Sequence, residues 1–353
     1  MELANGLGAA GVEVHVAIMG TPLSTAQWKQ THDVPRLSIH ESPRALAGMD
    51  EPWSDEADAA QWLLALEHDL RPDLIHLNGY SYASLPWSAP VLIVGHSCVF
   101  SWFGAVKRTT PPVEWEGYRR SIVGGLCAAD GVVATTNAML RALTSHYGNY
   151  RSLGCIYHGR DSEQFRSTEK EPFILTSGRL WDDAKNVAAL ERIAPQLAWP
   201  VHIAGDAPPP LGGSVNTGGA RKLGRLSPGD MAHWMSRASI FCLPARYEPF
   251  GLTALEAALS GCAIVLGDIP SLREMWHGAA LFVPPDDPAA LRRALERLIE
   301  NDDERADMAH RARTRALEFS PQRMTDGYLN AYRELVRRSA KSISTVPDGL
   351  SLE

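Results

Sequence analysis

Residues 239–268 read SIFCLPARYEPFGLTALEAALSGCAIVLGD, and this run predicts one unit of a parallel α/β sheet. The segments SIFCLPA and CAIVLGD are short, apolar and closed by turn residues, as buried strands are. Between them, LTALEAALSG has the spacing of a helix that ends at glycine. A strand, a helix and a strand in this order predict a right-handed crossover between parallel strands.

The same alternation continues on both sides of this unit. Further strands are predicted from GVEVHVAIM, DLIHLNG, PVLIVGHS, ADGVVATT, FILTSGRL, PVHIAGD and LFVPPDD. The alternation pauses at residues 154–172, where Gly, Pro and charged residues cluster without periodicity. We therefore predict an α/β protein with two doubly wound parallel-sheet domains, 1–155 and 156–320. Ligands of such sheets bind at the carboxyl ends of the strands, so a cleft between the domains is the expected site.

The two ends of the chain carry helical patterns. MELANGLGAAG predicts a helix ahead of the first predicted strand, and a last helix is predicted from Pro321 to Arg338. The polar residues 339–353 are predicted to be disordered.

Composition excludes several classes of protein. The 353 residues are 45% hydrophobic and 21% charged, as in ordinary globular proteins, and the net charge of -7 argues against a dedicated nucleic-acid binder. No segment has the roughly 20 apolar residues of a membrane helix. No secretory signal or cysteine pairing pattern stands out, so a cytoplasmic protein is expected. Basic helical stretches such as RELVRRSAK are interpreted as solvated faces, with a weak peripheral contact with the inner face of a membrane as the alternative.

A pair of cations follows the strand FILTS. Gly178 lets the chain turn close to a ligand, and Arg179 and Lys185 stand just beyond it. A guanidinium fork and a mobile ammonium suit a diphosphate. The alternative is two surface charges beside the neighbouring acidic residues, Asp182 and Asp183.

Two carboxylates frame the start of the helix in the opening run. Glu248 ends the predicted strand, Gly251 frees the chain, and Glu256 lies one turn into the helix. The first amides of a helix favour an anion. A carboxylate beside such an anion site is suited to sugar or ribose hydroxyls, so we predict hydroxyl binding; a helix cap with one solvated Glu is the alternative.

His96 follows the strand PVLIVG in the first domain, where it is predicted to face the cleft. Imidazole can bind a sugar hydroxyl or move a proton near neutral pH. A structural histidine is the alternative.

At this point the chain resembles the family 4 retaining glycosyltransferases of the GT-B fold. The resemblance runs through CIYHGRDSEQF, SGRLWDDAKN, KLGRLSPGD, the opening run and ALFVPPDDPAALRRAL, and more faintly through the first domain. The family has two glutamates with seven residues between them, and Glu248 and Glu256 match this spacing. Asn78 stands where many members have His or Asp.

The resemblance implies roles for these residues. Glu248 would contact the donor sugar, Glu256 the ribose, and His96 would sit by the reacting carbon, so His96 and Glu248 are the candidate catalytic residues. The implied donor-binding set is Gly178, Arg179, Lys185, Gly224, Arg225, Leu226, Phe250, Gly251, Leu252, Thr253 and Glu256. It also implies transfer from a nucleotide-sugar donor to an unknown glycosyl acceptor with retention of configuration, no metal or other cofactor, and a last helix that packs back on the first domain.

The resemblance has one departure, because the family pattern begins with a strand and a Gly-rich loop ahead of the helix that MELANGLGAAG resembles. The first strand of the N-terminal domain is therefore expected to be missing. Two alternatives to a transferase remain: an epimerase of the same fold that acts on the nucleotide-sugar itself, and a nucleotide-sugar-binding relic without turnover.

Overall fold

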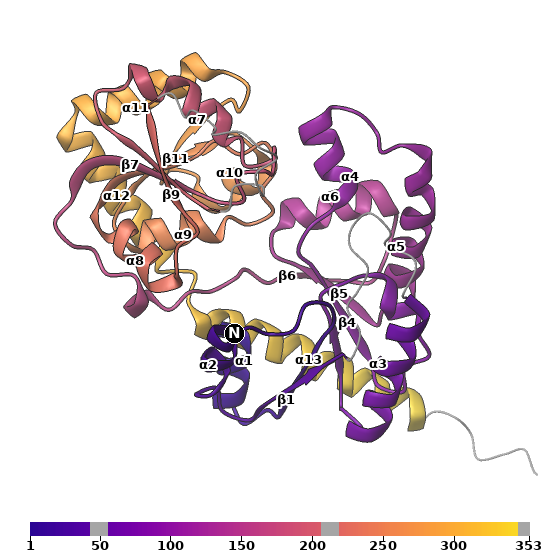
Figure 1. The fold of residues 1–353 in the computed structure, drawn as a ribbon. Coiled ribbons are helices and arrows are strands. Elements are labelled where there is room, and N and C mark those ends of the chain that lie inside the picture. The colour runs from indigo at the N-terminus through magenta and orange to yellow at the C-terminus, as the bar shows by residue number, and fades with distance from the viewer. Residues whose placement is uncertain (43–55, 206–218, 345–353) are drawn as a thin grey trace, which may run out of the picture.

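The computed structural model describes residues 1–42, 56–205 and 219–344, which form two parallel-sheet units joined side by side (Figure 1). The predicted α/β fold class is confirmed. The C-terminal unit has one six-stranded parallel sheet in the order β12-β11-β10-β7-β8-β9. Its strands are β7 Glu171–Ser177, β8 Val201–Ala204, β9 Ala220–Gly224, β10 Ala238–Leu243, β11 Ala263–Gly267 and β12 Leu281–Val283. Its helices are α7 Val187–Ile193, α8 Pro228–Arg237, α9 Leu252–Leu259, α10 Pro270–Trp276, α11 Pro288–Glu300 and α12 Asp302–Ala316.

The N-terminal unit holds its parallel strands in two sheets. A four-stranded sheet has the order β3-β4-β5-β6, and β1 pairs separately with β2. The strands are β1 Val14–Ile18, β2 Leu37–Glu41, β3 Ile75–Leu77, β4 Val91–Gly95, β5 Gly131–Ala134 and β6 Ser152–Cys155. The helices are α1 Glu2–Ala9, α2 Thr25–Thr31, α3 Glu56–Leu70, α4 Val99–Trp102, α5 Glu116–Ala128 and α6 Asn137–Tyr147. A single sheet was expected, but within the described residues no strand links β1 to β3.

Buried apolar strands explain why the sheets form. Every residue of β4, β10 and β11 is buried, since helices cover both faces of a parallel sheet. The strand β2 escaped prediction because its sequence LSIHE mixes polar and apolar residues and is only half-buried along its length.

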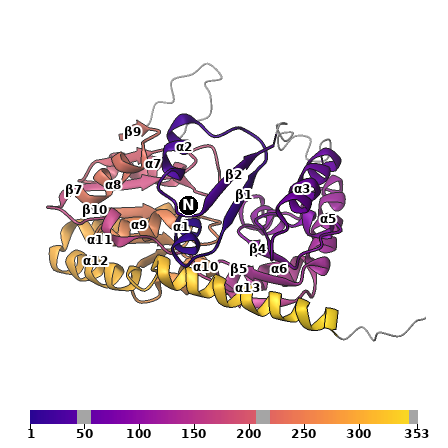
Figure 2. The same ribbon diagram turned by 90° about the horizontal axis from the view of Figure 1, so that it is seen from below.

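The helix α13, Pro321–Ser344, runs from the C-terminal unit along the N-terminal one (Figures 1 and 2). Met324, Tyr328 and Leu335 pack there against strands β4 and β5. The helix continues past Arg338, so residues 339–344 are helical where disorder was predicted, and the ion pair of Arg338 with Glu334 supports this last part. Residues 345–353 lie outside the described residues. No described helix is both long and apolar enough to cross a bilayer.

The two units touch where the carboxyl ends of their strands meet. The Cys98 amide, after β4, is 2.7 Å from the Tyr247 hydroxyl, after β10. Trp102 donates its indole N–H to Asp182 at 3.2 Å, and Lys107 pairs with Asp183 at 3.0 Å. Trp102 thus bridges the two units.

Candidate functional site

The carboxyl ends of β7, β8 and β9 form one continuous edge. The Gly178 amide donates to the Ala204 carbonyl at 3.1 Å, and the Gly205 amide donates to the Gly224 carbonyl at 2.9 Å. A Cβ at Gly205 would lie 1.8 Å from the Gly178 oxygen, so glycine is needed there. The turn at Gly224, Arg225 and Leu226 therefore follows the same sheet edge as Gly178.

Lys185 and Glu248 form an ion pair at the centre of this edge. The Lys185 ammonium lies 2.5 Å from Glu248 Oε2, and the two side chains are 16% and 12% exposed. Glu248 Oε1 also accepts the Gly251 amide at 3.0 Å. The strand β10 ends at Leu243, so Glu248 lies in the following loop and not at the strand's end as predicted. The loop is held through this carboxylate.

The helix α9 begins at Leu252, as the sequence predicts. Gly251 precedes it with φ 91°, a left-handed conformation that favours glycine, and Phe250 is buried beneath the turn. The Gly251 amide was expected to support a phosphate, but it donates to Glu248 in this structure. The first turn of α9, with Leu252 and Thr253 half-buried, faces the same loop.

Arg179 and Lys185 have different partners. The Arg179 guanidinium donates to Asp182 at 2.8 Å and lies 5.4 Å over the Trp181 ring, with its side chain 61% exposed. This agrees with the alternative of a surface pair. Lys185 is half-buried against Glu248 and is less exposed than Arg179.

Glu256 accepts a hydrogen bond from Arg160 at 2.8 Å, and its side chain is 13% exposed. Burial raises the pKa of its carboxyl, and the nearby Arg160 charge counters this. Arg160 also pairs with Glu2 of α1 at 3.7 Å. The carboxylate predicted to bind ribose hydroxyls is thus oriented by a side chain from the segment between the two units.

His96 lies in a cluster of histidines at the end of β4. Its Nε2 is 2.8 Å from Asn78 Oδ1, and its ring stacks on His158 at 5.4 Å with nearly parallel planes. Burial lowers the pKa of His96, and burial with the neighbouring His96 and Arg160 lowers the pKa of His158 to about 4. Since an amide oxygen only accepts, the neutral His96 carries its hydrogen on Nε2, which leaves Nδ1 as an acceptor.

Sequence reasoning missed His158 and Arg160. Both lie in residues 154–172, which have no periodic pattern and were interpreted as a link between domains; CIYHGRDSEQF carried part of the family resemblance, but no role was assigned to either residue. Their partners lie far along the chain: Arg160 and Glu256 are 96 positions apart. Two signals were available: the family resemblance of CIYHGRDSEQF and the concentration of charged and aromatic side chains in a segment between two sheets.

Replacing Asn78 by Asp should move the acid limb of the pH–rate profile to higher pH by about one unit. A carboxylate beside Nε2 stabilises the imidazolium and so raises the pKa of His96. If neutral His96 is needed, activity is lost as pH falls through that higher pKa. The same charge change at the exposed Asn330 is the control, and an equal shift in both variants would contradict the role of His96.

Comparisons with known proteins show which family the chain resembles. A model described as Glycosyltransferase Family 4 matches residues 1–164, and one described as Glycosyl transferases group 1 matches residues 171–301. O-antigen chain mannosyltransferase B of Escherichia coli is 31% identical over 164 residues, which are 46% of this chain. The chain spans 38% of the length of that relative.

Two solved structures are similar in fold over nearly the whole chain. Sucrose-phosphate synthase from Thermosynechococcus elongatus has a TM-score of 0.80 at 19% identity, covering 96% of this chain and 92% of that one. Anabaena HepE in complex with UDP and glucose has a TM-score of 0.71 at 16% identity, covering 95% of each chain. At these identities the similarity shows a shared GT-B fold.

Proposed function

Because this chain belongs to the family 4 type of glycosyltransferases, we propose that it transfers a sugar from a nucleoside-diphosphate sugar to an acceptor with retention of configuration. The observation that carries the proposal is the arrangement of Lys185, Glu248 and Glu256 around the start of α9. Lys185, from the loop between β7 and α7, pairs with Glu248 of the loop before α9, and Glu256 lies on α9 itself. HepE, which shares the fold, is described in complex with UDP-glucose, in line with a nucleotide-sugar donor.

The proposed reaction breaks the bond between the anomeric carbon and the diphosphate oxygen, whose electron pair leaves with the diphosphate. Lys185, the N-terminal end of α9 and Arg179, swung from Asp182, would stabilise the developing charge. Glu256 would accept hydrogen bonds from the ribose, and Glu248 from the donor sugar. Neutral His96, across the cleft, would accept a hydrogen bond from the sugar beside the reacting carbon. The acceptor hydroxyl oxygen forms the new bond to the anomeric carbon, and its proton passes to an oxygen of the leaving diphosphate.

To bind the donor sugar, Glu248 would have to exchange its present ion-pair and hydrogen-bond partners for sugar hydroxyls. In the structure its carboxylate pairs with Lys185 and accepts the Gly251 amide. A diphosphate that takes over Lys185 and the Gly251 amide would release Glu248 toward the sugar hydroxyls. We propose that the ion pair keeps either half-buried charge from being left without a partner, which would cost about 1–3 kcal/mol.

Thermal unfolding with UDP-, GDP- and ADP-hexoses tests the donor class. We expect the hexose donor of one of these three nucleotides to raise the midpoint of thermal unfolding clearly. A ligand at a concentration of about a hundred times its Kd stabilises the native state by about 2.7 kcal/mol. A parallel incubation without acceptor, followed by sugar analysis, addresses the epimerase alternative. Formation of an epimer in the incubation without acceptor, or no rise of the unfolding midpoint with any donor, would contradict the proposal.

A further inference from the structure

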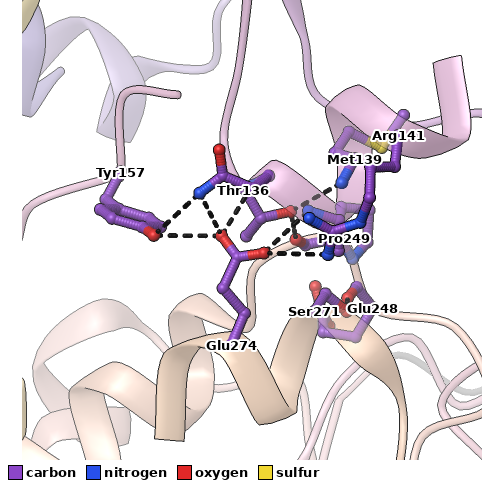
Figure 3. Close-up of polar contacts among 10 residues, drawn as sticks. Thr136, Met139, Arg141, Tyr157, Glu248, Pro249, Ser271 and Glu274 are labelled. Carbon is purple, nitrogen blue, oxygen red and sulfur yellow. Dashed lines mark hydrogen bonds and ion pairs between the residues drawn. The ribbon is translucent and has the colours of Figure 1, made fainter. Parts of the chain in front are cut away.

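Glu274 lies on α10 of the C-terminal unit, yet its carboxylate binds the start of α6 in the N-terminal unit (Figure 3). Oε1 accepts the Asn137 amide at 2.7 Å and Oε2 accepts the Ala138 amide at 2.8 Å. The Tyr157 hydroxyl donates to Oε1 at 3.0 Å. The side chain is only 14% exposed, so this is an enclosed contact between the units.

The free backbone amides at the N-terminus of a helix explain why a carboxylate binds there. The first amides of a helix have no partner inside it and carry partial positive charge, which a carboxylate satisfies. Thr136, the residue before α6, accepts the Met139 amide at 3.1 Å. The remaining cap is supplied by Glu274, which is 137 positions from Asn137 and belongs to the other unit.

The same two elements hold the loop that carries Glu248. The Thr136 hydroxyl donates to the Pro249 carbonyl at 3.1 Å, and the Ser271 hydroxyl, in the first turn of α10, donates to the Glu248 carbonyl (Figure 3). Thr136 of the N-terminal unit and Ser271 of α10 therefore both form hydrogen bonds with main-chain carbonyls of this loop. Glu274 connects α10 with the start of α6, next to Thr136.

We propose that Glu274 is a positioning residue for sugar transfer. It would hold the loop that carries Glu248 in a fixed position relative to His96 of the N-terminal unit. The inference rests on the proposed function. Lys185 and Glu256, which are assigned to the nucleotide, belong to the C-terminal unit, and their ion pairs are with Glu248 and Arg160 and not with residues of α6. Loss of the Glu274 contact should therefore reduce the rate of transfer and leave nucleotide binding intact.

The variant Glu274→Gln tests this positioning role. Its single amide oxygen can replace only one of the two carboxylate oxygens, and its NH₂ group would face another N–H donor. We expect kcat to fall at least about tenfold, as other displaced catalytic groups do, with the nucleotide Kd from calorimetry within twofold of wild type. Amide hydrogen exchange should accelerate at residues 137–139 and 250–251.

The control is Arg141→Ala, because Arg141 lies 3.6 Å from Glu274, is 69% exposed, and leaves the carboxylate in place. It should keep kcat within twofold. A Glu274→Gln enzyme with near wild-type kcat would overturn the inference, as would parallel loss of kcat, nucleotide affinity and thermal midpoint. If the wild type transfers no sugar, the proposed function fails; unchanged exchange at residues 137–139 and 250–251 then overturns the inference separately.

Discussion

Replacing Lys185 by methionine should lower kcat/KM for sugar transfer by about 10²–10³-fold. Lys185 is less exposed than Arg179, and its ammonium group would stabilise the charge that develops on the leaving diphosphate. Methionine keeps the length and apolar stem of the side chain and removes that charge. Steady-state nucleotide release with a saturating acceptor measures the effect.

The same change also removes the partner of Glu248. A partly buried carboxylate that loses a charged hydrogen bond is expected to destabilise the fold by about 1–3 kcal/mol, measured by urea unfolding. Lys222→Met is the matched control, since Lys222 pairs with Glu191 at 3.4 Å in a similarly half-buried position on β9. It should lose comparable stability and keep its turnover. Equal loss of turnover in the two variants would mean that Lys185 acts only through stability.

The change Glu256→Gln should weaken donor binding about tenfold to a hundredfold. Two charged hydrogen bonds from ribose hydroxyls would become neutral ones, and a hydrogen bond to a charged group contributes roughly 1.5–3 kcal/mol. Glutamine keeps the shape of the side chain. Calorimetric titration of the free nucleoside diphosphate reports the effect without any dependence on turnover.

A neighbouring carboxylate supplies the control for this variant. Glu2→Gln removes the other acidic partner of Arg160 and leaves Glu256 charged. Its nucleotide affinity should stay within about twofold of wild type. Unchanged affinity in Glu256→Gln would refute the ribose assignment, and equal losses in both variants would assign the effect to Arg160.

Most strands of the C-terminal unit could be predicted because their signals are local, but β9 was missed, since its sequence ARKLG has no continuous apolar run and is mostly half-buried or exposed. The strand that ends at Ser177 and the helix that starts at Leu252 are each marked by an apolar run and by a glycine at its boundary. The expected positions of Lys185 and Glu256 followed from these elements. Their partners did not follow, because Lys185 and Glu248 are 63 positions apart and meet only in the folded chain.

The N-terminal unit was harder to predict for physical reasons. Strand β2 is only half-buried, so its sequence lacks the continuous apolar run that marks a parallel strand. The strands of the N-terminal unit are divided between two sheets, and which strands pair with each other cannot be predicted from local sequence patterns. The role of Glu274 was equally hidden, because its sequence context is an ordinary helix and its partners are backbone amides of another unit.

Proton NMR of the anomeric signal during turnover is the most direct test of retaining transfer. The protein would be incubated with the nucleoside-diphosphate α-hexose that it binds most tightly and with candidate acceptors. The account predicts that nucleoside diphosphate is released and that the first product signal is that of an α-linked sugar. A β-linked first product, a donor epimer formed without acceptor, or no nucleotide release with any donor would contradict it.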